Sequence, residues 1–437
     1  MKNKFRYIAI LLSLMLILIS CSKGSNSMHL EVDINENIEP KVDQVMDKYI
    51  DEIIPGGVVL AAKDGKVVFQ KAYGNAQVFD NADFTNIDNP TAQRMEIPRK
   101  TELDTLYDMA SVTKIMSTTQ AIMKLHSEGK LKLEDKVTNY LPDFGKNGKE
   151  NVKIEQLLTH TSGMPQWVPS FFYVSNDRDK ELEFINNLGL IFEPGEHKYS
   201  DFGFMTLAYI VEAISGEKFD VYLEKEIYKP LGMKNTVFNP LDKGFKPEQI
   251  AATSWGNPFE YRMVDEVNYP DFGYDTTIYE EGFKQFDGWR KEILVGKVND
   301  GNAGMSNNGI AGHAGLFSNA NDLAILGQLM LNGGEYKGVK LYDKDTINLF
   351  TKNHLGEDNR GFGFELNKTY MGDLASDKTY GHNGFTGTHV YFDPENNIQV
   401  MVLTNKQNLG LNEKGSYPGT FNFVKEVSEA IYEELIK

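Results

Sequence analysis

The sequence predicts an α/β (α+β) fold in which strands from the two ends of the chain form one antiparallel sheet, flanked by helices, around a largely helical inserted subdomain. A hairpin pattern near residues 58–73 and alternating apolar residues over 385–404 indicate strands, and the residues between them show helical periodicity. We expect the sheet part at about 39–110 and 335–437 and the helical part at about 111–334. The cleft between the two parts is the natural place for a site.

The N-terminal part of this body begins with a helix and a hairpin. Residues 39–54 have apolar positions at helical spacing, and the pattern stops at a Pro-Gly-Gly sequence. Val58–Lys63 and Lys66–Tyr73 are predicted to be two strands, and the Asp64-Gly65 pair between them is a strong turn signal. Residues 75–100 are polar and are expected to be irregular.

The middle of the chain is rich in helical patterns, which we place at Ser111–Glu128, 154–159, Tyr199–Ser215, 219–229 and Asp322–Asn332. Residues 239–300 are rich in Tyr, Asp, Gly and Phe and have weak periodicity, so we expect a surface insertion that lines a substrate groove. Near the end, Phe385–Phe392 and Ile398–Thr404 alternate as strands, and the last 20 residues are expected to form a helix.

The first residues predict export. A short basic start is followed by an apolar run at 8–19, which has the length of a signal-peptide core and is short for a membrane span. The Ser20-Cys21 pair that follows resembles the lipobox of bacterial lipoproteins. We therefore expect a signal peptide over 1–20, a lipid on Cys21, a flexible tether over 21–38 and a membrane-anchored location in the bacterial cell envelope. The alternative is an ordinary signal peptide with an incidental cysteine.

Composition excludes several partners and cofactors. The 437 residues carry a formal net charge of -17, and nucleic-acid binding needs clustered Lys and Arg, so no nucleic-acid partner is expected. Cys21 is the only cysteine, which rules out an internal disulfide. The eight histidines are scattered without a metal-binding motif, and no dinucleotide motif follows a strand, so we expect neither metal nor cofactor.

A serine with a lysine three residues later is the candidate catalytic pair. The lysine amine can take the proton of the serine hydroxyl when its pKa is lowered. The pattern alone is weak, because it occurs four times: Ser20/Lys23, Ser111/Lys114, Ser127/Lys130 and Ser215/Lys218. Only the pair Ser111/Lys114 opens a long apolar helix, where free N–H groups and the positive end of the helix dipole lie close to the serine.

Six stretches carry further motifs in a fixed order: LYDMASVTK at Leu106–Lys114, IEQLLTHTSGMP at Ile154–Pro165, FEPGEHKYSDFGF at Phe192–Phe204, PLGMKNT at Pro230–Thr236, AGHAGLFSNANDL at Ala311–Leu323 and GHNGFTGT at Gly381–Thr388. Together they resemble the serine β-lactamase and penicillin-binding-protein superfamily, specifically its class C-like branch. The resemblance covers roughly residues 40–435 and implies the fold of that superfamily.

The resemblance implies roles for residues far from Ser111 in the sequence. Tyr199 matches the tyrosine of a Y-x-N motif and would share the acid and base roles with Lys114. Asp201 stands where Asn is usual, and its carboxylate would favour a protonated Lys114 and disfavour a substrate carboxylate nearby. His382 takes the place of the lysine of the Lys-Thr-Gly motif and would be partly cationic.

Three more residues are candidates around the same site. Gly384 would leave room for substrate beside its strand, and the N–H of Phe385, with that of Ser111, would form the oxyanion hole. His313, in a Gly-His-Ala-Gly sequence, is a candidate for substrate contact or for packing in a tight turn. His160 is expected to be structural.

These residues predict acyl transfer through a Ser111 ester that water then hydrolyses. The expected substrate is a small molecule or a muropeptide, with an amide or peptide of the cell wall preferred, because segments such as VNDGNA at Val298–Ala303 resemble members linked to muropeptide turnover, amidases and D,D-peptidases among them. The missing Lys-Thr-Gly motif argues against an efficient β-lactamase. The alternatives are a broad short-chain esterase and a non-catalytic penicillin-binding or sensor lipoprotein.

Overall fold

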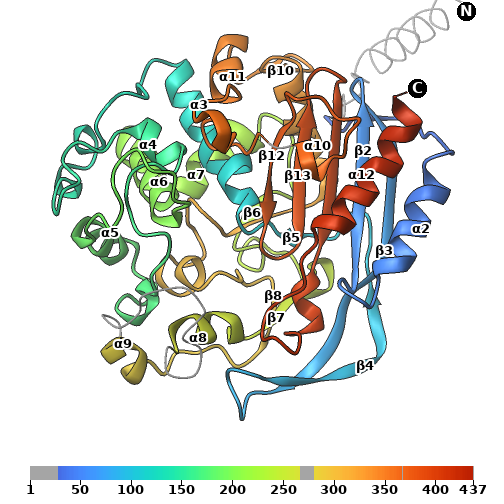
Figure 1. The fold of residues 1–437 in the computed structure, drawn as a ribbon, viewed down its shortest axis with the longest axis horizontal. Helices are drawn as coiled ribbons and strands as arrows, with labels where there is room; N and C mark the ends of the chain where they lie inside the picture. The colour runs from blue at the N-terminus through green and yellow to red at the C-terminus, as the bar shows by residue number, and fades with distance from the viewer. Residues whose placement is uncertain (1–27, 266–279, 367, 437) are drawn as a thin grey trace, which may run out of the picture.

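The computed structural model describes residues 28–265, 280–366 and 368–436 (Figure 1). Within these residues the main sheet has seven strands in the order β1-β3-β2-β14-β13-β12, with β4 paired to β3. Neighbouring strands are antiparallel except β1 and β3. The strands are β1 (Glu31–Val32), β2 (Gly56–Lys63), β3 (Lys66–Asp83), β4 (Thr91–Lys100), β12 (Tyr380–Gly384), β13 (Thr388–Asp393) and β14 (Ile398–Thr404). The two ends of the chain thus share one sheet, which confirms the predicted fold class.

The centre of the sheet is held by the pairing of β2 with β14, which joins residues more than 300 positions apart, such as Leu60 and Met401. Alternate side chains of both strands enter different hydrophobic cores: Leu60 packs into the core on the helical side, and Val59 into the core on the opposite side. The β2–β3 turn uses Asp64 at φ 52° and Gly65 at φ 79°, the left-handed pair that a tight hairpin requires.

Helices cover both faces of the sheet. On one face lie α2 (Glu39–Tyr49) and α12 (Phe421–Leu435), which share a core with Val59 and Val400. On the other face lie α10 (Ala320–Leu331) and the helical part (Figure 1). Further helices contribute to the same core: α3 (Thr119–Ser127), α4 (Ile154–Leu158), α5 (Arg178–Asn187), α6 (Asp201–Ser215), α7 (Phe219–Leu223) and α11 (Lys344–Phe350).

A separate three-stranded sheet lies next to Ser111 in the sequence. β5 (Tyr107–Asp108) and β6 (Val237–Phe238) both pair with β9 (Leu316–Ser318). The insertion predicted at 239–300 contains β7 (Ala252–Trp255), α8 (Pro258–Val264), α9 (Glu280–Gln285) and β8 (Ile293–Val295), and a further hairpin is formed by β10 (Glu335–Tyr336) and β11 (Val339–Lys340). The insertion therefore has ordered elements despite its weak periodicity.

Two expectations need correction. Residues 75–100 are mostly strand and not irregular, because β3 continues to Asp83 and pairs with β4 (Thr91–Lys100) in a long two-stranded ribbon. Most of β4 is exposed, so its sequence lacks the alternation that marks a half-buried strand. The flexible tether does not extend to residue 38 either, since β1 pairs with β3 and Ile38 is buried.

The predicted signal peptide over 1–20 and Cys21 lie outside the described residues. Of the described helices, none has the length and apolar character needed to cross a bilayer.

Candidate active site

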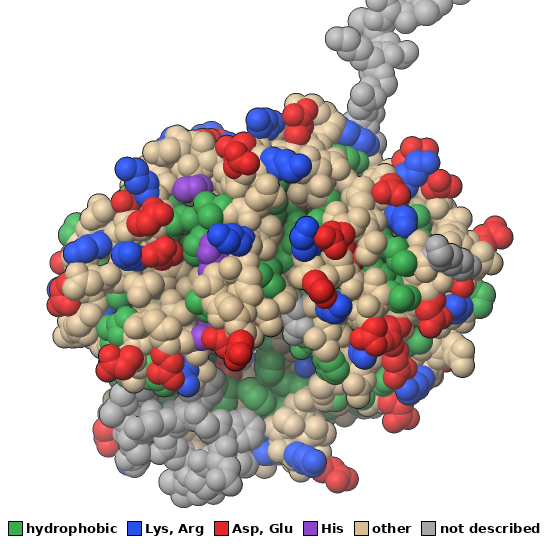
Figure 2. All heavy atoms as spheres, turned by 45° about the horizontal axis from the view of Figure 1, so that its top comes forward, with side chains coloured by type: hydrophobic (Ala, Val, Ile, Leu, Met, Phe, Trp, Pro, Cys, Tyr) green, Lys and Arg blue, Asp and Glu red, His purple; other side chains and the backbone are tan. Residues whose placement is uncertain are grey.

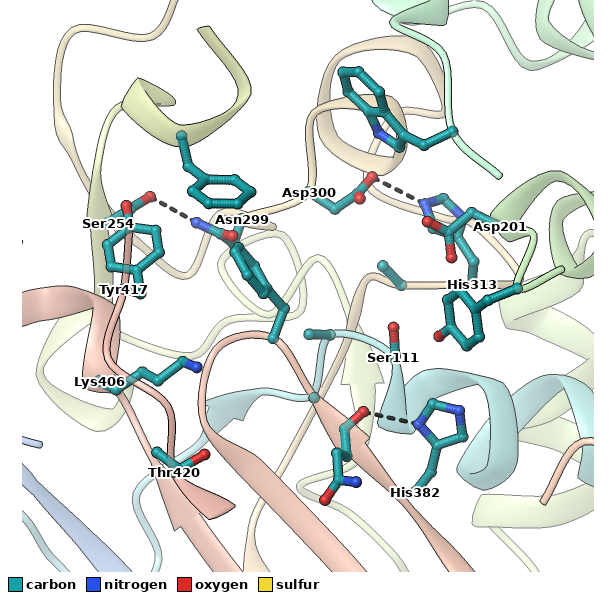
Figure 3. Close-up of a pocket in the computed structure, with 18 of the residues that line it drawn as sticks. Ser111, Asp201, Ser254, Asn299, Asp300, His313, His382, Lys406, Tyr417 and Thr420 are labelled. Carbon is teal, nitrogen blue, oxygen red and sulfur yellow. Dashed lines mark hydrogen bonds and ion pairs between the residues drawn. The ribbon is translucent and has the colours of Figure 1, made fainter. Parts of the chain in front are cut away.

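A cleft of about 690 Å³ lies between β12, the helical part and the insertion. Charged side chains of both signs are scattered over the face shown in Figure 2, and a hollow between them exposes hydrophobic side chains. The cleft lining includes all of the sequence-predicted site residues except Lys114, which is buried behind it: Ser111, Tyr199, Asp201, His313, His382, Gly384 and Phe385. Segments distant in sequence thus meet at one site (Figure 3).

Ser111 lies on a sharp turn between β5 and the following helix. Ala110, just before it, has φ 45°, a left-handed conformation that is rare for a residue with a Cβ. The Asp108 carboxylate accepts the N–H of Ala110 at 2.9 Å and so holds the turn. The helix after Ser111 begins as a π-helical turn over Lys114–Thr118 and continues as α3. This geometry presents the Ser111 hydroxyl to the cleft.

The Lys114 ammonium lies at the centre of the site. Nζ donates to Ser111 Oγ at 3.0 Å and to the backbone oxygen of His313 at 3.2 Å, and it lies 2.7 Å from Asp201 Oδ1. It also lies 4.8 Å from the centre of the Tyr199 ring. The Lys114 side chain is fully buried, so its charge depends on these neighbours.

The balance of burial and charge keeps Lys114 protonated. Burial lowers the pKa of Lys114, but the Asp201 carboxylate, with a further contribution from Tyr199, outweighs it, so the net pKa is raised. Burial likewise raises the pKa of Tyr199, although Lys114 opposes this. The substrate-free site therefore holds an ammonium and a neutral phenol, and only the fraction of Lys114 in the amine form can accept a proton.

Tyr199 is oriented by the residues around it. The sequence places it at the start of a helix, but α6 begins at Asp201, with Ser200 as its N-cap. The backbone N–H of Ser200 donates to His160 Nδ1 at 3.0 Å, and the His160 ring stacks on Tyr199 with centroids 4.4 Å apart. His160 thus has the structural role that was expected for it, and that role is to support Tyr199.

His382 differs from expectation in its charge. Burial lowers the pKa of His382 to about 4, and the nearby Glu365 carboxylate only partly compensates. The ring is therefore neutral near pH 7, not partly cationic, because the strand that replaces Lys-Thr-Gly is covered by other side chains. His382 Nδ1 lies 2.8 Å from the backbone oxygen of Asn383, which leaves Nε2 as the atom that lacks a hydrogen bond in the described structure.

Gly384 brings the edge strand close to the nucleophile. A Cβ at Gly384 would collide with Thr388 Oγ1 and lie 2.5 Å from the Met109 oxygen, so only glycine fits. The next residue, Phe385, is 43% exposed and borders the cleft with Ser111. Within the described part of the chain, neither the N–H of Ser111 nor that of Phe385 forms a hydrogen bond, so both are available to an oxyanion.

His313 forms an ion pair that the sequence does not reveal. Its Nε2 lies 2.9 Å from Asp300 Oδ1 (Figure 3). Burial lowers the pKa of His313, but Asp300 outweighs it and the net pKa is raised. Among the described residues Asp201, Asp300 and His313 form a group whose ligand atoms lie within 4.8 Å of one another. Their oxygens already face Lys114 and His313, and the absence of a metal stays a prediction.

The cleft also contains residues that the sequence motifs did not predict. Glu365, which forms an ion pair with Arg360 at 3.3 Å, accepts a hydrogen bond from Asn383 Nδ2 at 3.0 Å. Lys406 and Asn299 line the cleft too. None of these belongs to a motif with distinctive spacing, although Asp300 and Asn299 lie in the VNDGNA segment.

The Ser111 hydroxyl is hydrogen-bonded to the buried Lys114, and Tyr199 lies beside them. This arrangement defines the protein as a serine hydrolase. The Beta-lactamase family model matches residues 38–417, and the chain belongs to that family.

Relatives with related names share most of its length. The chain is 36% identical over 402 residues to a Bacillus subtilis (strain 168) protein named "N-acetylmuramyl-L-alanine amidase", covering 87% of this chain and 84% of the relative. It is also 36% identical over 437 residues to an Escherichia coli (strain K12) protein named "Putative D-alanyl-D-alanine carboxypeptidase", with 94% of each covered. A penicillin-binding protein homologue from Caulobacter crescentus has the same fold, with a TM-score of 0.63 and 20% identity over 92% of this chain and 98% of that one.

Proposed function

We propose that this protein hydrolyses an amide of peptidoglycan-derived muropeptides through an ester on Ser111. The observation that carries the catalytic part is the 3.0 Å hydrogen bond between Lys114 Nζ and Ser111 Oγ at the wall of a cleft of about 690 Å³. The substrate class is supported by the similarity to the Bacillus subtilis amidase across most of both chains.

The proposed reaction has two steps. Ser111 Oγ attacks the amide carbonyl while its proton passes to the Lys114 amine, assisted by the Tyr199 hydroxyl, and the N–H groups of Ser111 and Phe385 stabilise the oxyanion. The C–N bond breaks, and the leaving amine takes the proton. Water then attacks the Ser111 ester by the same proton route, which releases the acid and restores the hydroxyl.

Charge near Ser111 favours an internal amide over a terminal one. In a D-alanyl-D-alanine substrate a free carboxylate lies next to the scissile bond. Asp201, which is partly exposed to the cleft, would repel such a group, as would an ionised Glu365. The amide between the lactyl group of N-acetylmuramic acid and L-alanine has no charge beside it, so we favour cleavage of that bond.

Mass analysis of digested muropeptides tests this proposal. Wild type should release the intact stem peptide and leave the sugar with a free lactyl carboxylate, and Ser111→Ala should release neither. Release of D-alanine instead would identify a carboxypeptidase. Turnover of p-nitrophenyl esters without any muropeptide product would identify an esterase, and stable labelling by a fluorescent penicillin without turnover would identify a sensor.

The same proposal places the enzyme on the outer side of the cytoplasmic membrane, held by a lipid on Cys21. It is supported by the basic, apolar and Ser-Cys order of the first 21 residues. Growth with labelled palmitate should label the wild-type protein in the membrane fraction. Cys21→Ser should lose the label, and persistence of the label in that variant would refute lipidation at Cys21.

A further inference from the structure

Lys406 is a buried cation in the wall of the cleft. It lies two residues after the end of β14, is only 8% exposed, and lines the cleft together with Phe385 and Tyr417. In Figure 3 its side chain points into the cleft from the side opposite to Asp201, with Ser111 between them. A substrate in the cleft could therefore contact the positive charge of Lys406 on the side away from the Lys114–Asp201 pair.

The charge of Lys406 has no carboxylate partner within the described residues, whose ion pairs do not include it. Its Nζ donates to the backbone oxygen of Pro418 at 3.1 Å and lies 5.6 Å from the centre of the Phe385 ring. An ammonium has three N–H donors, so two remain for another acceptor. Burial lowers the pKa of Lys406 to about 8, so the ammonium still predominates at pH 7.

Three carboxylates that line the cleft differ from Lys406, because each of them lies next to a group of opposite charge. Asp201 lies 2.7 Å from Lys114, Asp300 lies 2.9 Å from His313, and Glu365 lies 3.3 Å from Arg360. Each of these acids is therefore paired with a cation of the protein. Glu260 also lines the cleft, but burial raises its pKa to about 8, so it is neutral near pH 7. A buried cation without such a partner is costly unless a ligand supplies the opposite charge.

We propose that Lys406 binds a carboxylate of the substrate at a distance from the scissile carbonyl. This inference rests on the proposed function and adds the substrate class: amides and esters whose leaving amine or alcohol carries a carboxylate. In a muropeptide the acidic residue of the stem peptide supplies such a group. The aromatic rings of Phe259, Phe385 and Tyr417, which contact one another beside Lys406, would cover the apolar atoms between the two points.

A matched pair of esters isolates the contribution of this charge. The pair is 4-acetoxy-3-nitrobenzoic acid, whose leaving phenol carries a carboxylate, and its neutral methyl ester, and release of the coloured nitrophenolate reports acylation for both. The measured quantity is the ratio of kcat/KM for the acid to kcat/KM for the methyl ester. Lys406→Gln should lower this ratio by about tenfold or more, because a charged hydrogen bond is lost. Lys406→Arg should keep most of it, and Lys340→Gln, an exposed lysine on β11, should leave it unchanged.

An unchanged ratio in Lys406→Gln would overturn the inference. A measurement on wild type covers the case in which that variant does not fold: glutarate should inhibit neutral-ester hydrolysis at least about tenfold more strongly than dimethyl glutarate. Equal inhibition would also overturn it.

Muropeptides separate this inference from the proposed function. Wild type should prefer a muropeptide with a free glutamate carboxylate over its amidated form, and Lys406→Gln should lose the preference. If muropeptides are cleaved but both forms react equally in wild type, the carboxylate inference fails alone. If wild type cleaves no muropeptide while the ester ratio still depends on Lys406, the proposed function fails and the inference stands.

Discussion

Lys114 Nζ and Asp201 Oδ1 lie 2.7 Å apart, in a site where the lysine side chain is fully buried. Burial alone favours the neutral amine, and the carboxylate reverses that preference. Asp201 therefore sets the fraction of Lys114 that can accept the Ser111 proton, and it does so at a position where the family pattern has a neutral asparagine.

Replacement of Asp201 by Asn should make Lys114 a better base near neutral pH. The pKa of Lys114 should fall, because burial still lowers it and the main opposing charge is gone. We expect acylation by p-nitrophenyl acetate to become severalfold faster below pH 8, as measured by the burst of p-nitrophenolate between pH 6 and 10, with Asp201→Glu as the control that keeps the charge. A rate that is unchanged or lower at every pH would contradict this role of Asp201.

Gly384→Ala should disable the site without unfolding the protein. The new Cβ would lie 2.5 Å from the Met109 oxygen and collide with Thr388, so β12 must move away from Ser111. Misplacement of an oxyanion donor costs about 100-fold in rate, which ester kinetics would detect. Gly189→Ala is the matched control, because its nearest contact would be 3.9 Å away. Near-normal activity of Gly384→Ala would show that the oxyanion is held elsewhere.

His389 should make the folded protein sensitive to acid. Burial lowers its pKa to about 3 from an ordinary value of 6.5, so the unfolded chain binds a proton near pH 5 and the folded chain does not. The contribution of His389 to the free energy of unfolding is therefore fully present above pH 6.5 and decreases as the pH falls. The decrease between pH 7 and pH 5 is about 2 kcal/mol. Urea unfolding at both pH values should show a drop smaller by about that amount in His389→Gln. Equal drops in both proteins would argue against a neutral buried ring.

Chelation should leave the activity unchanged. Although Asp201, Asp300 and His313 form a group of potential metal ligands, Asp201 is paired with Lys114 and Asp300 with His313. A divalent cation would have to displace both pairs. Ester hydrolysis after dialysis against EDTA should equal that of the untreated enzyme. A loss that added Zn²⁺ restores would show instead that the cluster holds a metal.

The central strands of the sheet and the site residues that belong to distinctive motifs could be predicted from the sequence. Val58–Lys63 and Ile398–Thr404 are mostly apolar because each strand is buried on two faces that belong to different cores, and they pair at the centre of the sheet. Ser111 could be selected from four similar pairs because a long apolar helix follows it. The exposed ribbon of β4 was missed because it has no buried face to produce a pattern.

The charge states of the site residues could not be predicted from the sequence. The neutral state of His382 depends on how deeply the ring is buried. The raised pKa of His313 depends on Asp300, thirteen residues earlier in the chain. Lys406 carries no motif, and its lack of a carboxylate partner among the described residues becomes visible only when the surrounding chain is in place.

The pairing of β1 with β3 fixes the chain to the sheet only a few residues after Cys21. The described chain starts at residue 28, and Glu31 is already fixed to the sheet beside Lys66. On the proposal that Cys21 carries a lipid, at most ten residue steps separate the anchor from this fixed point, a reach of about 35 Å even when fully extended. Such an enzyme would act only within a thin zone at the membrane surface. It would bind soluble fragments that diffuse to the membrane, and it would not reach the outer layers of the wall.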